Sequence, residues 1–303
     1  MGYSGRYHAA SLAAVFLALA VGILIGVGFG SDIVTGTADD LEQGLEADLD
    51  EARAEVDDLQ AELERERAFE GAVFPAVVGD RMRDDGVALI ALGGLNQATA
   101  DDVEAAIGPA GATLEEVAVV RDPPDLDALA GTLEGRRSRA LARGDAEALR
   151  LYGERAGRAL VLGSESFDRL RGTLLSRYSG RPGGIDSVVV VRSRADDLEP
   201  GEEVTSAALE EGLIAGLSDV AITVGAETTD ADPSSIGFFD SQGVATVDSV
   251  DLISGRVALV FALTGSASGN FGIKESADSL LPELLAAGAE QDARGRSAGA
   301  DGG

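Results

Sequence analysis

The residues best suited to chemistry in this sequence are an aspartate and an arginine near its C-terminal end. Asp248 directly follows the apolar run 244–247, which we predict to be a strand, and Arg256 lies in the next predicted helix. Domains with a parallel sheet bind their ligands at the carboxyl ends of the strands. The two residues therefore form a candidate ligand edge. The alternative is a structural Asp–Arg contact or a helix cap, with no ligand.

Two adjacent glycines belong to the same candidate ligand edge. Gly93 and Gly94 end the predicted strand 86–92 and precede a predicted helix. A glycine turn before a helix lets a phosphate group approach the backbone closely. The spacing G-x-G-x-x-G is missing, however, and no lysine follows as it does in a P-loop. A tight turn from strand to helix is the alternative.

The sequence offers few groups for metal binding or covalent catalysis. It has no cysteine, and its one histidine, His8, has no other ligand type beside it. These counts exclude zinc-thiolate sites, cysteine nucleophiles and a Ser-His-Asp triad in the later part of the chain. Lys274 is the sole lysine and no serine motif accompanies it, so we expect no enzyme activity and no resident cofactor. Two acidic pairs are either weak sites for hard cations or simply polar turns: Asp230 with Asp232, and Asp248 with Asp251.

The composition limits which partners the protein can bind and which residues can form its hydrophobic core. The chain has 303 residues, and 24 basic against 53 acidic side chains give it a formal net charge of −29. Such a charge repels the phosphates of nucleic acids, so we expect no nucleic-acid partner. Hydrophobic residues make up 45% of the chain but aromatic residues only 4%, so any core must consist mainly of alanine, valine, leucine and isoleucine.

A long apolar run near the N-terminus predicts a membrane span. Residues 9–30 carry no charge, and a helix of this length, at ~1.5 Å per residue, covers the roughly 30 Å of a bilayer core. We therefore predict a cytoplasmic stub over 1–8 and a transmembrane helix over 9–30. Arg6 precedes the run and acidic residues follow it, which places the C-terminal domain outside the cell membrane of a single-pass protein. A cleaved signal peptide and a buried core helix are the alternatives.

The acidic stretch that follows predicts a coiled-coil stalk. Over 39–70 apolar residues recur in alternating steps of four and three, and most other positions are acidic. A narrow apolar stripe needs a partner, so we expect a parallel homo-oligomer; a helix folded back onto the next domain is the alternative. Small residues spaced by four in the N-terminal run predict helix pairing there as well. The predicted oligomer seam comprises Gly22, Gly26, Leu45, Leu49, Val56, Leu59 and Leu63.

Residues 72–287 predict an α/β domain. The predicted strands are 86–92, 115–120, 185–191, 220–224 and 244–247. Between them lie the predicted helices 99–111, with Thr99 as N-cap, 205–219 and 254–265, and a stretch of helical character over 125–178. Strands without polar alternation, separated by helices, indicate a doubly wound, mostly parallel sheet covered on both faces. The tail 288–303 is rich in glycine, alanine and aspartate, which predicts disorder.

Several segments resemble the actinobacterial copper-transport family labelled MctB. The segments are Tyr7-His8-x-x-Ser11, the acidic heptads, Thr246-Val247-Asp248 with Gly255-Arg256-Val257, and Gly269-Asn270-Phe271-Gly272. The resemblance runs from residue 7 to about 282, and it makes His8 part of the pattern that starts the apolar run. It implies a single-span envelope protein with a role in copper homeostasis or efflux, for which an outer-membrane channel has also been suggested.

The residues themselves do not favour direct copper binding. Copper(I) prefers thiolate and thioether ligands, and the chain beyond the predicted span has only Met82 to offer. A single apolar helix also has no lumen for ions. The alternative function is a membrane-anchored coiled-coil adaptor for cell-envelope or division proteins, with no transport activity. A third is a small-ligand binder or enzyme that uses the edge at Asp248.

Overall fold

The computed structural model describes residues 5–163, 167–194 and 198–282. The chain divides into two compact units, Met1–Phe69 and Glu70–Gly303, which we describe separately. The first four residues of the predicted stub and the whole predicted tail 288–303 lie outside the described residues.

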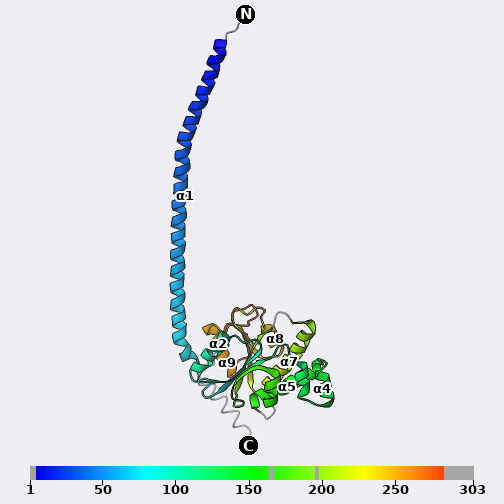
Figure 1. Cartoon of the computed structure of the whole chain (residues 1–303). Helices are drawn as coiled ribbons and strands as arrows, with labels where there is room; N and C mark the ends of the chain where they lie inside the picture. Colours follow the sequence, from blue (N-terminus) through cyan, green and yellow to red (C-terminus); the bar gives the residue numbers. More distant parts are fainter. Residues whose placement is uncertain (1–4, 164–166, 195–197, 283–303) are drawn as a thin grey trace. The chain divides into compact units, whose positions relative to one another are not determined.

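One long helix, α1 (Gly5–Val78), runs through the first unit and covers both the apolar run and the acidic stretch (Figure 1). In the described part of the chain, no helix combines the length and the apolar character needed to cross a membrane. This finding corrects the predicted transmembrane helix over 9–30 and the single-pass topology built on it.

The predicted oligomer seam lies on this helix and is uncovered within one chain. A methyl group added at Gly22 or Gly26 would meet no atom within 4 Å. The five larger seam residues are 45–61% exposed: Leu45, Leu49, Val56, Leu59 and Leu63. The structure thus confirms a helix over 39–70, whereas its pairing with a second chain stays a prediction.

The second unit is built around a sheet of seven strands in the order β3-β2-β1-β4-β5-β6-β7. The strands are β1 (Gly86–Gly93), β2 (Thr113–Val120), β3 (Leu175–Gly180), β4 (Ser187–Ser193), β5 (Ile222–Ala226), β6 (Ala245–Val247) and β7 (Asn270–Phe271). All neighbours pair in parallel except β2 and β3. The α/β class with a mostly parallel sheet is confirmed. The edge strand β3 overlaps the end of the stretch 125–178, which was predicted to be helical. The strand was missed because its side chains are largely exposed and carry no apolar run.

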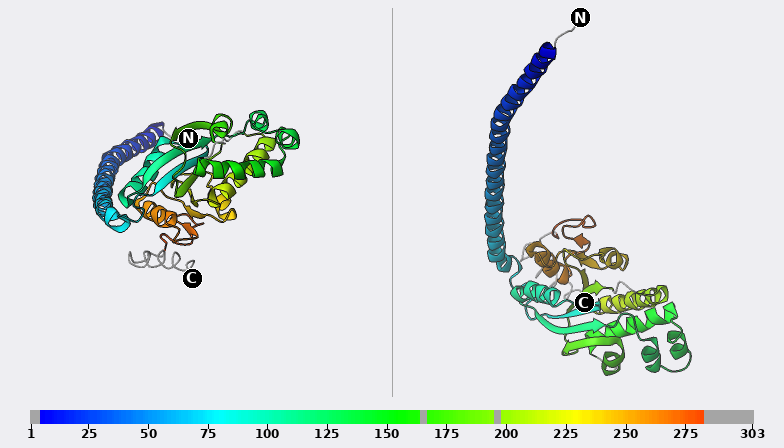
Figure 2. Two further views of the ribbon diagram at one scale, coloured as in Figure 1. Left: turned by 90° about the horizontal axis from the view of Figure 1, so that it is seen from below. Right: turned by 45° about the horizontal axis from the view of Figure 1, so that its top comes forward.

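Helices cover both faces of the sheet, which is why its central strands are apolar on both sides (Figures 1 and 2). One core lies under α2 (Gln97–Ile107), α9 (Ile253–Leu263) and the last turns of α1, where Phe74 and Val78 are buried. The other core lies under α3 (Leu126–Gly131), α4 (Gly135–Leu141), α5 (Ala146–Leu162), α6 (Phe167–Leu174) and α7 (Pro200–Ser218). The short η1 (Gly108–Ala110) and α8 (Ile236–Ser241) connect strands.

Helices α5 and α7 lie side by side in close contact because glycines face each other across their interface (Figure 1). A Cβ at Gly157 would lie 2.5 Å from the main-chain oxygen of Leu213, and one at Gly216 would lie 2.1 Å from that of Glu154. Gly153 and Gly212 make equivalent contacts one turn earlier. Both helices therefore use the spacing of one small residue in every four that lets helix backbones approach closely, here inside the α/β domain.

Candidate ligand edge at the ends of β1, β4 and β5

A cleft of about 360 Å³ lies at the carboxyl ends of β1, β4 and β5. Strand β2 follows β1 on one side of the sheet, whereas β4 continues the sheet on the other side, so the order of the strands reverses between β1 and β4. Ligands of open α/β sheets bind at this kind of reversal. The cleft is lined by residues that follow the three strands, including Gly94, Asn96, Thr99, Arg192, Arg194, Glu227, Asp230 and Asp232.

The two glycines after β1 bring the backbone of that strand against the end of β4. Gly93 has a φ of +90°, and a Cβ there would lie 2.1 Å from the main-chain oxygen of Ser193. The N–H of Gly94 donates to the same oxygen at 3.0 Å. Helix α2 begins directly after Asn96, whose side chain accepts a hydrogen bond from the N–H of Ala98. Asn96 is thus the N-cap in place of the predicted Thr99, which instead lines the cleft.

A buried ion-pair cluster closes the β4 side of the cleft. Glu210 of α7 is only 4% exposed, and its Oε2 lies 3.0 Å from the guanidinium of Arg192 and 3.7 Å from that of Arg194. The guanidinium of Arg192 also stacks 4.2 Å from the ring centre of Phe238. Burial raises the pKa of Glu210, and the two arginines partly offset that rise. The cluster holds the end of β4 against α7.

On the β5 side, a buried carboxylate holds the sole lysine. The Nζ of Lys274 lies 2.6 Å from Oε1 of Glu227 and donates to the main-chain oxygens of Thr228 and Ala231. Glu227 also accepts from the hydroxyl of Ser234 and from the N–H of Ser235. The ammonium group therefore fills a cage of oxygen atoms that would otherwise suit a hard cation.

Asp248 positions this lysine and lies one strand away from the cleft. Its carboxylate accepts from the N–H groups of Ile273 and Lys274, at 2.9 and 2.8 Å, and the residue is 1% exposed. Gly272 has a φ of +140°, and a Cβ there would collide with Oδ1 of Asp248. Asp248 thus binds the turn after β7, and its side chain is occupied by main-chain donors.

Arg256 pairs with a residue other than the predicted one. Its guanidinium lies 2.8 Å from Oδ1 of Asp102 in α2 and donates to the main-chain oxygen of Val250. The arginine therefore joins α9 to α2 over one face of the sheet. Of the four predicted edge residues, Gly94 lines the cleft, Gly93 precedes it, and Asp248 and Arg256 support the surrounding structure.

The remaining predicted metal ligands are partly occupied by local contacts. Asp230 accepts from the hydroxyl of Thr228, and Asp251 accepts from both the N–H and the hydroxyl of Thr229. Among the residues that the structure describes, no group of three or more acidic or histidine side chains is arranged to hold a metal ion. Met82 is fully buried, and the side chain of His8 lies outside the described residues.

Sequence reasoning missed Glu227 and considered Lys274 only as a catalytic group. A signal for Glu227 was present, because it directly follows the apolar run that became β5 and so had to end at the carboxyl edge. Its partner is 47 residues later, and no local pattern connects the two.

Comparison with known proteins identifies a family that matches nearly the whole chain, including the cleft. A family model described as "Copper transport outer membrane protein, MctB" matches residues 3–282. The chain belongs to this family. Proteins named "Copper transporter MctB" from Mycobacterium bovis and Mycobacterium tuberculosis are each 26% identical to it over 320 residues. That alignment covers 91% of this chain and 98% of each relative.

The MctB match extends over both compact units, from α1 through β7. It therefore includes the cleft as well as the segments 246–257 and 269–272 on which the resemblance was first noted. The family description names an outer membrane protein, which indicates an association with the cell envelope.

Proposed function

We propose that this protein takes part in copper transport or copper homeostasis at the cell envelope. The observation that carries the proposal is the extent of the family match, which leaves no domain of the chain outside it. The relatives, which align along 98% of their length, are named copper transporters, and this supports the same role here.

Within that role, the cleft at the ends of β1, β4 and β5 is the binding site of the domain, and its ligand is a small polar molecule. Arg194 presents a guanidinium group that is 25% exposed, and Asp230 and Asp232, which also line the cleft, are exposed. A site with both charges at a strand-order reversal suits a polar ligand better than bare copper(I), which prefers sulfur. The lysine cage and the Glu210 cluster keep the rim rigid, so the site is preformed.

A growth assay in copper tests both parts of this proposal, the role in copper handling and the role of the cleft. A strain that lacks the gene should grow less well in excess copper than its parent, with no change in excess zinc, and the wild-type gene should restore growth. Thr99→Trp would fill the cleft from the first turn of α2 without touching the ion pairs. We expect this variant not to restore growth, and Ala98→Trp, on an exposed neighbouring position outside the cleft, to restore it.

Two results would count against the proposal, one against the role in copper handling and one against the role of the cleft. A deletion strain that tolerates copper as well as its parent would remove the copper role. Full restoration by Thr99→Trp, with both variants present at wild-type amounts, would remove the role of the cleft but leave the copper role standing.

A second candidate function is that of a coiled-coil adaptor that brings envelope proteins together. The specific observation that favours it is the row of exposed leucine and valine side chains along α1, each 45–61% exposed in the single chain. Apolar residues in a heptad pattern need a partner helix. A homo-oligomer formed through Leu45, Leu49, Val56, Leu59 and Leu63 supplies that partner and is compatible with the copper role.

A further inference from the structure

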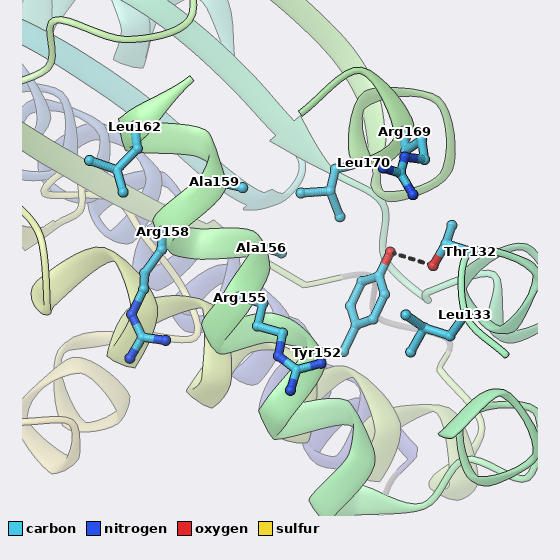
Figure 3. Close-up of a pocket in the computed structure, with 10 residues that line it drawn as sticks. All are labelled: Thr132, Leu133, Tyr152, Arg155, Ala156, Arg158, Ala159, Leu162, Arg169 and Leu170. Atoms are coloured by element: carbon cyan, nitrogen blue, oxygen red, sulfur yellow. Dashed lines mark hydrogen bonds between the residues drawn. The ribbon is translucent and has the colours of Figure 1, made fainter. Parts of the chain in front are cut away.

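A second cavity, separate from the cleft, lies between α5, α6 and the residues that follow α3. Its volume is about 340 Å³, and Figure 3 shows the side chains around it. Apolar atoms dominate its walls, which are formed by Leu133, Tyr152, Ala156, Ala159, Leu162 and Leu170. This volume and this lining are typical of a pocket for a small molecule with an apolar body.

Two hydroxyl groups face each other in the wall of this α5–α6 pocket. The hydroxyl of Tyr152 faces that of Thr132 at 3.4 Å, as the dashed line in Figure 3 marks. The Thr132 hydroxyl also donates to the main-chain oxygen of Leu129 at 2.7 Å, so its remaining capacity is to accept a hydrogen bond.

Two arginines from different helices line the pocket, and within the described residues neither has an acidic partner. Arg155 of α5 and Arg169 of α6 are exposed, and neither forms an ion pair with a residue in the described ranges. Arg158 also lines the pocket but differs, because it is bound by Glu154 and Asp219, each at 2.6 Å. The pocket therefore has two guanidinium groups available for an anion.

The stretch of chain that forms the pocket is more basic than the protein as a whole, although Arg150 and Arg158 pair with acidic residues outside it. The stretch 135–181 contains 11 arginines and 5 acidic residues, in a chain whose formal net charge is −29. Acidic side chains elsewhere on the protein repel anions. The local excess of arginine makes this stretch more favourable for anion binding.

The apolar surface continues beyond the pocket along α5. A neighbouring hollow of about 220 Å³ shares Leu133, Tyr152 and Arg155 with it. Leu151 lines this hollow and is 49% exposed, and Leu162 at the other end is 62% exposed. A linear aliphatic chain longer than the pocket itself would thus still lie against apolar side chains.

We propose that the α5–α6 pocket binds an amphipathic anion, a molecule with one aliphatic chain and a carboxylate or phosphate head. The chain lies on the alanine and leucine walls, and the head binds at the rim of the pocket, where Arg155 and Arg169 supply guanidinium groups. Guanidinium groups bind carboxylate and phosphate oxygens with paired, charge-assisted hydrogen bonds. The proposal stands on the lining of this pocket alone and does not depend on a role in copper handling.

Calorimetric titration of the full-length chain tests the site with four single-chain probes. Dodecanoate and dodecyl phosphate carry the two candidate heads, dodecanol has none, and dodecyltrimethylammonium has the opposite charge. We expect saturable binding of the anions, and the tighter of the two identifies the head. Arg155→Gln and Arg169→Gln should each weaken anion binding about tenfold, the effect of losing one hydrogen bond to a charged group. Decanoate should bind roughly fifteenfold more weakly than dodecanoate, since each methylene contributes about fourfold.

Arg143→Gln is the matched control, because it removes the same charge from an exposed position outside the pocket. Anion binding that Arg143→Gln weakens as much as Arg155→Gln would reflect general attraction and overturn the proposal. Binding that none of the three variants changes would also overturn it, since contact with the exposed apolar side chains of α1 would behave in this way. Equal binding of dodecanol and dodecanoate would show that the arginines play no part, with the same consequence.

Discussion

The ammonium group of Lys274 lies 2.6 Å from Oε1 of Glu227, and this contact joins the turn after β7 to the end of β5. The carboxylate is 4% exposed and the lysine side chain 21%. Asp248 holds the main chain of the same lysine from the next strand. At this part of the rim, Lys274 is therefore held by two carboxylates, one at its ammonium group and one at its main-chain N–H.

Replacing the lysine should destabilise the domain strongly. Lys274→Met leaves Glu227 buried without its countercharge, and we expect a loss of about 3 kcal/mol in the free energy of unfolding. Denaturant unfolding followed by circular dichroism measures it. The double variant with Glu227→Gln should recover at least half of the loss, because the uncompensated charge is then absent. Equal stability of Lys274→Met and wild type would mean that water screens the pair.

Glu116 should make the stability of the domain depend on pH. It lies on β2, is 1% exposed, and accepts a hydrogen bond from the hydroxyl of Tyr178 at 3.3 Å. Burial raises its pKa from about 4.5 to about 7, and the bond from Tyr178 opposes that rise. A folded-state pKa above the unfolded value means that the unfolded chain releases the proton first. This residue therefore costs stability progressively as pH rises from about 4.5 to about 7.

Glu116→Gln isolates this contribution from the other carboxylates. The variant should match wild type near pH 4 and exceed its unfolding free energy by up to about 3 kcal/mol above pH 7. Glu115→Gln, at the neighbouring and more exposed position, is the control and should leave the pH profile unchanged. Parallel profiles for Glu116→Gln and wild type would contradict the raised pKa.

The contact between α5 and α7 should not tolerate a single added methyl group. A Cβ at Gly216 would lie 2.1 Å from the main-chain oxygen of Glu154, so Gly216→Ala must push the helices apart. We expect a loss of about 3 kcal/mol, at the upper end for overpacked cores. Gly201→Ala, in the same helix but with no atom within 4 Å of the new methyl, should change stability by less than about 1 kcal/mol. Similar thermal midpoints for the two variants would argue against close backbone contact.

The seam of α1 should determine the oligomeric state. Val56→Asp puts a charge into the exposed heptad seam and should shift the protein toward monomer in sedimentation equilibrium. Ala54→Asp adds the same charge at the outermost heptad position and should have little effect. Association of the wild type should strengthen with salt, because the stretch 39–70 carries 14 acidic residues and 3 arginines. A wild-type protein that is monomeric at all concentrations would contradict the prediction that these residues form an oligomer interface.

Local patterns in the sequence predict most of the sheet. The apolar runs became β1, β2, β4, β5 and β6, because a strand buried on both faces must be apolar throughout. The edge strand β3 and the short β7 escaped prediction, since one is exposed and the other has only two residues. The apolar run at the N-terminus proved helical, but the described structure does not support the membrane span inferred from it.

By itself the sequence determined the α/β class, the position of the carboxyl edge, the lack of cysteine and the exposed heptad pattern, because each of these depends on residue types or on spacing along the chain. Only the tertiary structure decided which groups meet. Arg256 pairs with Asp102 across 154 residues, Glu227 with Lys274 across 47, and the glycines of α5 face those of α7. Such contacts depend on how the sheet brings distant helices and turns together. No local stretch of the chain contains the information that sets this arrangement.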